Sequence, residues 1–322
     1  MRRREFIVAL GASAVWPFAA YSQPHMPRVG VLFNGYAVSS SDLLIADKLK
    51  RLGYVDGRNI TYEIRAAEND VTRLPLLARE LVATRPDVIV GSTVQAAVAL
   101  FNATQDIPVV MTVIGDPVAL GLSGSMSRPT DNITGFTISS VSLAAKRLEI
   151  LRSAVPALNK VAYLWVPQNP GTVFLELQVQ QAANAFGIKL MSLPLKSDAD
   201  IAGAFARADE ERVTAVLVEA DRLTLNFNAH IVDECLIRDL PAMHAWPIEV
   251  RNGALMSYGP AEFENIAGAA IYVDRILKGA KAAELPFEEP TDIKLVINLR
   301  TARAIGLAFP PTLLARADEV IE

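Results

Sequence analysis

Residues that carry most enzyme chemistry are scarce in this chain of 322 residues, which contains one cysteine and three histidines. The single cysteine, Cys235, can form no disulfide within the chain, and we expect it to be a small buried apolar residue. The histidines, His25, His230 and His244, do not stand at the spacing of metal ligands, so we expect no metal site. His244 ends a short predicted strand and could face a cleft, but a buried structural histidine is the preferred interpretation.

Motifs for nucleotide binding and for catalytic serines are also missing. The chain has no G-x-G-x-x-G after its first predicted strand, no Walker A motif and no G-x-S-x-G elbow. Its formal net charge of −4 provides no electrostatic footprint for nucleic acid. We therefore expect no cofactor, no catalytic residues and no nucleic-acid partner, and we predict that the chain is not an enzyme.

The N-terminus has the composition of an export signal. Three arginines at 2–4 precede an apolar run over 8–20 and a pair of small residues at 20 and 22. The run is shorter than the roughly 20 residues that a membrane-spanning helix needs. We predict a signal peptide over residues 1–22, of the twin-arginine type because Phe6 and Ile7 follow the arginines. An ordinary secretory signal or an uncleaved anchor is the alternative. The processed protein is expected in the periplasm, with no membrane span.

From residue 28 onward, short β-rich runs alternate with longer helical patterns, which predicts βαβ units and parallel sheets. The first group has predicted strands at 28–34, 59–65, 87–91 and 107–112, and predicted helices at 39–52, 71–84 and 93–104. The second has predicted strands at 160–166, 188–193, 215–219 and 241–244, and predicted helices at 172–186, 200–211 and 223–239. We therefore predict an α/β fold with two doubly wound parallel-sheet lobes.

Three segments are predicted to connect the lobes: residues 115–140, rich in Gly, Ser, Pro and Asn, and then 256–260 and 286–291. A helix over 261–277 would return to the first lobe, and a strand over 292–298 with a helix over 300–305 would complete the second. The predicted boundaries are 27–135 plus 260–286 for the first lobe, and 140–256 plus 290–322 for the second. Several crossovers form a hinge, and a cleft between the lobes follows.

Small polar residues follow two predicted strands of the first lobe. Ser92 and Thr93 open a helix directly after a strand, so backbone N–H groups and two hydroxyls could hold an anion there. A plain N-cap by either residue is the alternative. Asp116 follows the next strand, where it could cap a helix beginning at Pro117 or pair with a ligand ammonium. Ligands of open α/β sheets bind beyond the carboxyl ends of the strands, where both turns lie.

The second lobe has matching positions at the ends of its predicted strands. Asn169 follows the first strand, Asp221 the third and Trp246 the fourth, while Tyr258 lies at a predicted crossover. Aromatic side chains next to fixed polar groups are typical of small-molecule clefts, although both aromatics could equally be core residues. The predicted ligand site consists of Ser92, Thr93, Asp116, Asn169, Asp221, Trp246 and Tyr258.

Motifs along the whole processed chain resemble one family. They are Gly53-Tyr-Val-Asp-Gly-Arg-Asn59, Gly115-Asp-Pro-Val-Ala-Leu-Gly121, Asn132-Ile-Thr-Gly135, Lys146-Arg-Leu-Glu149, Gly253-Ala-Leu-Met-Ser-Tyr-Gly259, Arg275-Ile-Leu-Lys-Gly279, Pro290-Thr291, Leu295-Val-Ile-Asn-Leu299 and the stretch 313–322. In this order they resemble the ABC-transporter substrate-binding family related to tryptophan- and tyrosine-binding importer components.

The resemblance implies a type I periplasmic-binding-protein fold, an amino-acid-like ligand between the lobes, and ABC permease and ATPase subunits as partners. Transferred by motif, the ligand turns are those at Ser92-Thr93, Asp116, Asn169, Asp221 and Tyr258. One departure concerns the pocket for the ligand's side chain. Members often carry Asn-Pro-Asn-Asn after the first strand of the second lobe, whereas residues 166–170 here read Val-Pro-Gln-Asn-Pro.

The sequence thus predicts an exported solute-binding protein, expected to be a monomer, that captures a small molecule between its lobes for an ABC-type importer. An exported α/β enzyme is one rival, but it would need a nucleophile–base pair or a metal cluster at the strand ends. A ligand-responsive transcription regulator would need an N-terminal helix-turn-helix where the export signal stands. A sensor role, in which the protein reports its ligand to a receptor, stays open.

Overall fold

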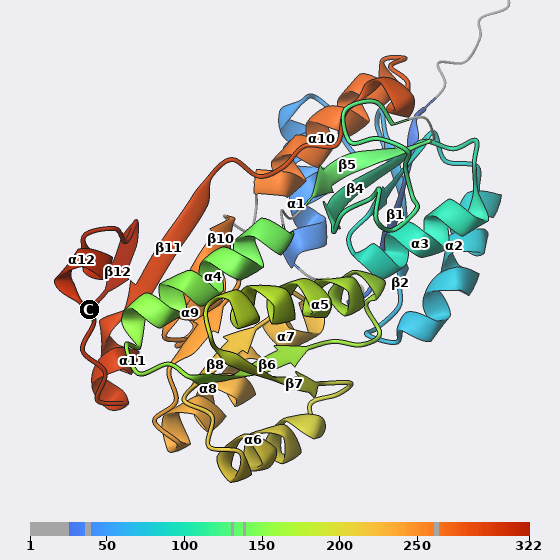
Figure 1. Ribbon diagram of the computed structural model, residues 1–322. Helices are drawn as coiled ribbons and strands as arrows, with labels where there is room; N and C mark the ends of the chain where they lie inside the picture. Colours follow the sequence, from blue (N-terminus) through green and yellow to red (C-terminus); the bar gives the residue numbers. More distant parts are fainter. Residues whose placement is uncertain (1–25, 36–39, 130–131, 138–139, 261–263) are drawn as a thin grey trace, which may run out of the picture.

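The computed structural model describes residues 26–35, 40–129, 132–137, 140–260 and 264–322. Its strands form two separate sheets, each with helices packed on both faces (Figure 1). We call the five-stranded sheet with its helices lobe 1, and the seven-stranded sheet with its helices lobe 2. The predicted α/β fold with two lobes is therefore confirmed.

Lobe 1 is built on parallel strands in the order β2-β1-β3-β4-β5. These are β1 (Arg28–Phe33), β2 (Thr61–Ala66), β3 (Val88–Gly91), β4 (Val109–Ile114) and β5 (Ile133–Thr137), with the short helix η1 (Val71–Arg73) after β2. Helices α1 (Ser40–Arg51) and α10 (Glu264–Leu277) cover one face, and α2 (Leu74–Ala83) and α3 (Val94–Ala103) cover the other. Because both faces are covered, the inner strands are nearly continuous runs of buried apolar residues.

Lobe 2 has the strand order β12-β11-β10-β9-β8-β6-β7, in which β10 and β11 are antiparallel and the other pairs parallel. The strands are β6 (Lys160–Trp165), β7 (Lys189–Pro194), β8 (Ala215–Val218), β9 (Ala242–His244), β10 (Met256–Pro260), β11 (Ile293–Asn298) and β12 (Glu319–Ile321). Helices α4 (Ser140–Ala154) and α5 (Pro170–Ala185) cover one face, and α6 (Asp200–Glu210) and α8 (Asn228–Ile237) cover the other. Shorter helices of lobe 2 are α7 (Arg222–Asn226), α9 (Pro247–Arg251), α11 (Leu299–Ala304) and α12 (Pro311–Leu314), whereas η2 (Ala282–Glu284) packs on β5 of lobe 1.

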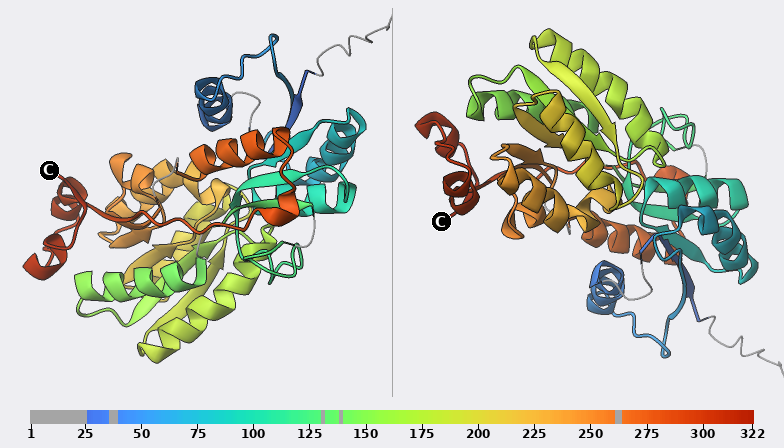
Figure 2. Two further views of the ribbon diagram at one scale, coloured as in Figure 1. Left: turned by 90° about the horizontal axis from the view of Figure 1, so that it is seen from above. Right: turned by 90° about the horizontal axis from the view of Figure 1, so that it is seen from below.

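The chain passes between the lobes at three places among the described elements. It leaves lobe 1 after β5 and enters lobe 2 with α4, and it leaves lobe 2 after β10 for α10, which packs on α1, β4 and β5. After η2 it returns to lobe 2 as β11. Figure 2 shows α10 beside the lobe 1 sheet and the C-terminal helices at the far end of lobe 2. The predicted return of this helix to the first lobe, and of the next strand to the second, is confirmed.

Two of the segments predicted to be crossovers are not simple connectors, because each contains a strand. Residues 115–140 include β5, and residues 256–260 are β10, which pairs with β9 and β11. Glycine and proline in these runs suggested connectors. The glycines instead allow close backbone approach. A Cβ at Gly135 would lie 2.2 Å from the carbonyl oxygen of Met111, and one at Gly259 would lie 1.9 Å from that of Ala245.

The third predicted crossover, 286–291, is a connector that hydrogen bonds hold to lobe 1. The Thr137 N–H donates to the carbonyl oxygen of Glu288 at 2.8 Å, and the Tyr272 hydroxyl donates to the Glu288 carboxylate at 2.7 Å. The helix predicted over 223–239 is divided at Phe227 into α7 and α8. The boundaries predicted for the two lobes stay predictions.

The predicted signal peptide, residues 1–22, lies outside the described residues. Within the described ranges, none of the helices combines the length and the apolar character that crossing a membrane requires.

Candidate functional site

Helix α3 begins where strand β3 ends, at the carboxyl edge of the lobe 1 sheet. Thr93 is the N-cap: its backbone is extended, and its hydroxyl accepts the N–H of Ala96 at 3.1 Å. Ser92 is half-buried, and its N–H donates to the carbonyl oxygen of Leu32 at 3.2 Å. The alternative of an N-cap at Thr93 is therefore realised, and the first N–H groups of α3 point out of the sheet edge.

Asn169 caps α5 at the carboxyl edge of the lobe 2 sheet. Its side-chain oxygen accepts the N–H of Gly171 at 2.9 Å, and its side-chain nitrogen donates to the carboxylate of Asp221 at 2.7 Å. Asn169 and Asp221 are 6% and 5% exposed. Two of the predicted ligand residues, 52 positions apart in the sequence, thus form one buried hydrogen-bonded pair.

Asp221 caps α7 and closes the turn between β8 and α7. Its carboxylate accepts the N–H of Leu223 at 2.8 Å, and its own N–H donates to the hydroxyl of Thr224 at 3.2 Å. The pKa of Asp221 is raised from 3.8 to about 6, mainly because the carboxyl group is buried; the hydrogen bonds from Leu223 and Asn169 oppose this shift, and the negative charge of Glu219 adds to it. The carboxylate therefore changes its charge in the weakly acidic range.

The N-termini of α3 and α5 meet at the boundary between the lobes. A Cβ built on Gly171, in the first turn of α5, would lie 3.7 Å from the side chain of Val94, the first residue of α3. The caps of these helices, Thr93 and Asn169, therefore lie at the same boundary. Each helix N-terminus carries a partial positive charge, so the arrangement favours an anionic group between them.

A cavity of about 390 Å³ lies beside this boundary and is lined by both lobes. Lobe 1 contributes Asn69 and Val71, and lobe 2 contributes residues that include Gln168 and Leu223. Gln168 is next to Asn169 in the sequence, and Leu223 donates its N–H to Asp221. The volume is within the range of small-molecule sites, roughly 300–1,000 Å³.

Asp116 occupies a different environment from the other predicted site residues. It is exposed, and its carboxylate accepts the N–H groups of Val118 at 2.9 Å and Ala119 at 3.0 Å. The carboxylate therefore caps the turn that follows β4. This is the first of the two roles predicted for it, although the turn does not continue as a helix.

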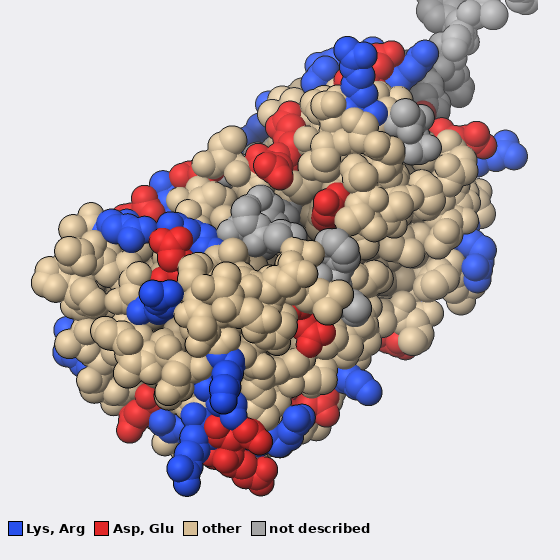
Figure 3. Space-filling view, viewed as in Figure 1, with Lys and Arg blue, Asp and Glu red and all other residues tan. Residues whose placement is uncertain are grey.

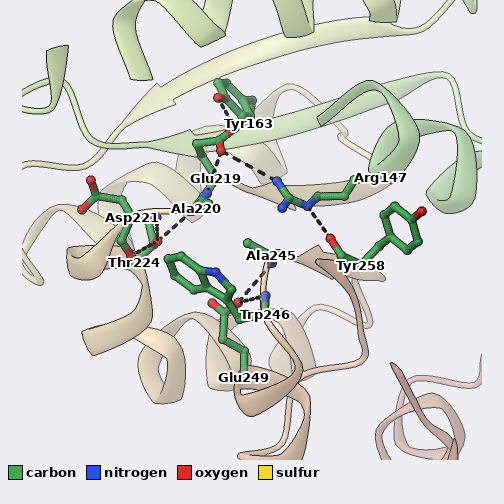
Figure 4. Close-up of polar contacts among 10 residues, drawn as sticks. All are labelled: Arg147, Tyr163, Glu219, Ala220, Asp221, Thr224, Ala245, Trp246, Glu249 and Tyr258. Atoms are coloured by element: carbon green, nitrogen blue, oxygen red, sulfur yellow. Dashed lines mark hydrogen bonds and ion pairs between the residues drawn. The ribbon is translucent and has the colours of Figure 1, made fainter. Parts of the chain in front are cut away.

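The two predicted aromatic residues are half-buried and point in different directions. Trp246 begins α9, and its backbone N–H donates to the carboxylate of Glu249 at 2.8 Å. Its indole lies on the side of Asp221 and Thr224 (Figure 4). The ring of Tyr258 points away from this group and packs against the apolar core beneath α4. Trp246 is thus the better placed of the two to meet a molecule near Asp221.

A buried charged group at the same sheet edge was missed by the sequence analysis. Arg147 on α4 is 2% exposed, Glu219 after β8 is 1% exposed and Tyr163 on β6 is fully buried (Figure 4). One signal could have revealed it. Arg147 stands three and four residues from Ala144 and Leu151, so it belongs to the apolar stripe of α4 that faces the core.

His244 is a structural residue, in line with the preferred interpretation. It and Glu249 are both fully buried, with the imidazole Nδ1 3.2 Å from the Glu249 carboxylate. Cys235 is also buried, as predicted, and burial raises the pKa of its thiol. Among the described residues, no group of His, Cys, Asp and Glu could hold a metal ion.

Charged side chains are spread over the face of the molecule seen in Figure 3. On this face, basic and acidic residues are interspersed, and neither sign forms a large patch.

Comparison with known proteins gives consistent relatives. A tyrosine-binding protein of Clostridioides difficile (strain R20291) is 24% identical over 263 residues, which cover 80% of this chain and 74% of the relative. A solved structure from Streptococcus pneumoniae, an ABC domain in complex with L-Trp, has a TM-score of 0.84 and 25% identity, covering 92% of this chain and 100% of that one. A conserved domain protein from Vibrio cholerae has a TM-score of 0.86 and 26% identity over the same shares of the two chains.

These likenesses confirm the type I periplasmic-binding-protein fold and the relation to tryptophan- and tyrosine-binding proteins that the motifs indicated. The family model described as ABC transporter substrate binding protein matches residues 31–321. The match spans both lobes and every turn described above, and the chain therefore belongs to the ABC transporter substrate-binding protein family.

Proposed function

We propose that the protein captures a small amino-acid-like ligand, aromatic by preference, between lobe 1 and lobe 2, and presents it to the permease and ATPase of an ABC importer. The observation that carries the proposal is the buried Asn169–Asp221 pair of lobe 2 beside the N-terminus of α3 in lobe 1. The tyrosine-binding relative and the structure with L-Trp support an aromatic amino acid as the ligand class.

The two charges of an amino acid match the two sides of this boundary. Its carboxylate would accept hydrogen bonds from the first N–H groups of α3 and from the hydroxyls of Ser92 and Thr93. Its ammonium would donate to Asp221, which Asn169 holds in place. Asp116 is assigned no contact of its own, because its carboxylate is exposed to solvent and caps the turn after β4.

The state of Asp221 suits this role. With a pKa of about 6, the carboxylate is mostly ionised at pH 7, and a ligand ammonium stabilises the ionised form further. Because Asp221 is buried, the attraction between its carboxylate and the ligand ammonium is screened less than it would be in water. The half-buried indole of Trp246 would supply apolar surface to the side chain of the ligand.

The biological setting is part of the proposal and rests on the sequence. A twin-arginine signal would export the folded chain to the periplasm, where it would act as a monomer. Ligand binding would close the lobes about the three passages of the chain, a hinge motion, and the closed form would dock on the permease. An uncleaved N-terminus, or a receptor in place of the permease, would change the destination of the ligand but not the site.

A thermal-shift screen tests the proposal. Ligand that binds only the folded chain adds about 2.7 kcal/mol to the free energy of unfolding at 100 times its Kd. L-tryptophan, L-tyrosine and L-phenylalanine should therefore raise the melting temperature by several degrees, and leucine by less. Mass spectrometry should recover each ligand chemically unchanged.

Two outcomes contradict the proposal. Conversion of a ligand into a product would show an enzyme instead of a binding protein. Melting temperatures that no amino acid changes would reject the ligand class, while leaving the membership of the family intact.

A further inference from the structure

The buried group around Glu219 holds a carboxylate in one fixed position. One oxygen of Glu219 accepts the Tyr163 hydroxyl at 2.6 Å, and the other accepts the backbone N–H of Ala220 at 2.8 Å. The guanidinium of Arg147 lies beside this second oxygen, with Nη1 at 3.8 Å, and its Nε donates to the carbonyl oxygen of Tyr258 at 2.7 Å. Figure 4 shows the side chains of Arg147, Tyr163 and Glu219 coming together, and they belong to α4, β6 and the turn after β8.

This group is linked to Asp221 through the backbone of one turn. The hydroxyl of Thr224 lies 2.8 Å from the carbonyl oxygens of both Glu219 and Asp221, and it accepts the N–H of Asp221. Glu219 also fixes the N–H of Ala220, the residue between the two carboxylates. Any change in the position of the Glu219 side chain is therefore passed to the turn that carries Asp221.

Fold stability alone does not account for Arg147. Its Nη1 is buried and has no hydrogen-bond partner, and the ion pair with Glu219 is longer than a hydrogen bond. Burial lowers the pKa of Arg147, against the opposing charges of Glu219 and Glu249. A buried ion pair with an unused donor is a poor stabiliser compared with apolar side chains of the same size. A role beyond packing is the more economical explanation.

We propose that Arg147, Tyr163 and Glu219 form a supporting cluster that positions Asp221 and sets the charge next to it, so that Arg147 is a positioning residue for ligand binding. The part of this inference that concerns the ligand rests on the proposed function. The part that concerns Asp221 does not.

The direction of the charge effect follows from the groups around Asp221. The titratable groups drawn with Asp221 in Figure 4 include Glu219 in its own turn, Arg147 on α4, Tyr163 on β6 and Glu249 on α9, and of these Glu219 acts on the pKa of Asp221 directly. The negative charge of Glu219 raises the pKa of Asp221, and the positive charge of Arg147 balances Glu219. Loss of the Glu219 charge should therefore lower the pKa of Asp221, and loss of the Arg147 charge should raise it.

The test follows the titration of Asp221 in the full chain without ligand. Carbon-13 labelling of aspartate and NMR between pH 4 and 8 would report the midpoint, with Asp221→Asn identifying the signal. We expect Glu219→Gln to lower the midpoint by roughly half a pH unit and Arg147→Met to raise it by a similar amount. The double variant Arg147→Met/Glu219→Gln should return near the wild-type value. Glu210→Gln, on the exposed end of α6, is the control and should shift nothing.

A second measurement connects the cluster with binding. The affinity for L-tryptophan is measured by calorimetry across the same pH range. As the pH is lowered, the affinity should begin to fall at a lower pH in Glu219→Gln than in wild type, and at a higher pH in Arg147→Met. Tyr163→Phe removes one donor to Glu219 without changing any charge. It should weaken binding a few-fold at all pH values, because the turn is held less firmly.

The outcomes separate the two claims. Midpoints that stay at the wild-type value in every variant, with melting temperatures lowered, would show a purely structural cluster and overturn the inference. If Arg147→Met does not fold, Arg147→Lys, which keeps the charge and should keep the midpoint, is compared with Glu219→Gln. If the variants shift the midpoint of the Asp221 titration but the protein binds no amino acid, the proposed function is rejected. The effect of the cluster on Asp221 would still hold.

Discussion

Lobe 1 and lobe 2 present different chemistry at the carboxyl ends of their strands. The described residues of lobe 1 offer the N-terminus of α3, two hydroxyls and the exposed carboxylate of Asp116. Those of lobe 2 include four charged side chains that are each at most 5% exposed: Arg147, Glu219, Asp221 and Glu249. The same alternation of strands and helices therefore produces an edge whose charge is exposed in lobe 1 and an edge with buried charges in lobe 2.

In the proposed function, the two lobes contribute to ligand recognition in different ways. The carboxylates of lobe 2 are held by hydrogen bonds before any ligand arrives, so little reorganisation is needed when a cation binds. Lobe 1 relies on a helix terminus, whose favourable interaction with an anion is worth about 0.3–2 kcal/mol. We expect lobe 2 to contribute more of the binding free energy than lobe 1.

The largest effect should come from removing the buried carboxylate of lobe 2. We expect Asp221→Ala to weaken amino-acid binding about 100-fold, or roughly 3 kcal/mol, because the ligand ammonium would be left buried and unpaired. The matched variant in lobe 1 is Asp116→Ala, which should change the affinity less than about two-fold. Calorimetry with L-tryptophan measures both. Equal losses of affinity in the two variants would show that the ligand ammonium does not bind to lobe 2 alone.

Asp221 should make the free energy of unfolding fall as pH rises. An exposed aspartate that caps a helix should have the opposite effect. The pKa of Asp221 is about 6 in the folded chain against an ordinary 3.8. Between these values the folded chain binds more protons than the unfolded chain, so the free energy of unfolding falls as pH rises. Asp221→Asn should therefore be more stable than wild type above pH 6, by roughly 2–3 kcal/mol, and about equal to it near pH 4.

Asp70 of lobe 1 is the comparison for this prediction. Its pKa is lowered, mainly by hydrogen bonds from the hydroxyl and N–H of Thr72. Its contribution is present above the ordinary pKa and is lost as pH falls, so Asp70→Asn should lose stability at neutral pH. Denaturant unfolding at pH 4, 5, 6, 7 and 8 checks both signs. A stability of Asp221→Asn that parallels wild type at every pH would contradict the shifted pKa.

A smaller effect than that of Asp221→Ala should come from the helix cap of lobe 1. Thr93→Ala removes the acceptor for the Ala96 N–H, and we expect it to reduce the free energy of unfolding by about 1 kcal/mol. It should also weaken L-tryptophan binding roughly five-fold, because one hydroxyl near the ligand carboxylate is lost. Thr93→Ser keeps the hydroxyl and should restore most of both quantities. An unchanged affinity in Thr93→Ala would place the carboxylate elsewhere.

The pattern of apolar runs was sufficient to predict most of the sheet elements. Strands β1 to β4 of lobe 1 and β6 to β9 of lobe 2 are continuous or alternating apolar runs with helical patterns between them. Strands β5 and β10 were missed because their glycines lower strand propensity, and only the neighbouring carbonyl oxygens of Met111 and Ala245 show why glycine is required. The break at Phe227 likewise has no signal in the apolar periodicity.

By itself, the sequence determined which turns carry polar groups, since each follows the end of a strand in a βαβ unit and the carboxyl ends of parallel strands share one edge. It did not determine which of those groups would meet. Only the tertiary structure paired Asn169 with Asp221, left Asp116 at the surface, and buried Arg147 beside Glu219. The physical reason is that such contacts depend on how the sheets and helices pack, over separations of 52 to 72 residues that no local periodicity encodes.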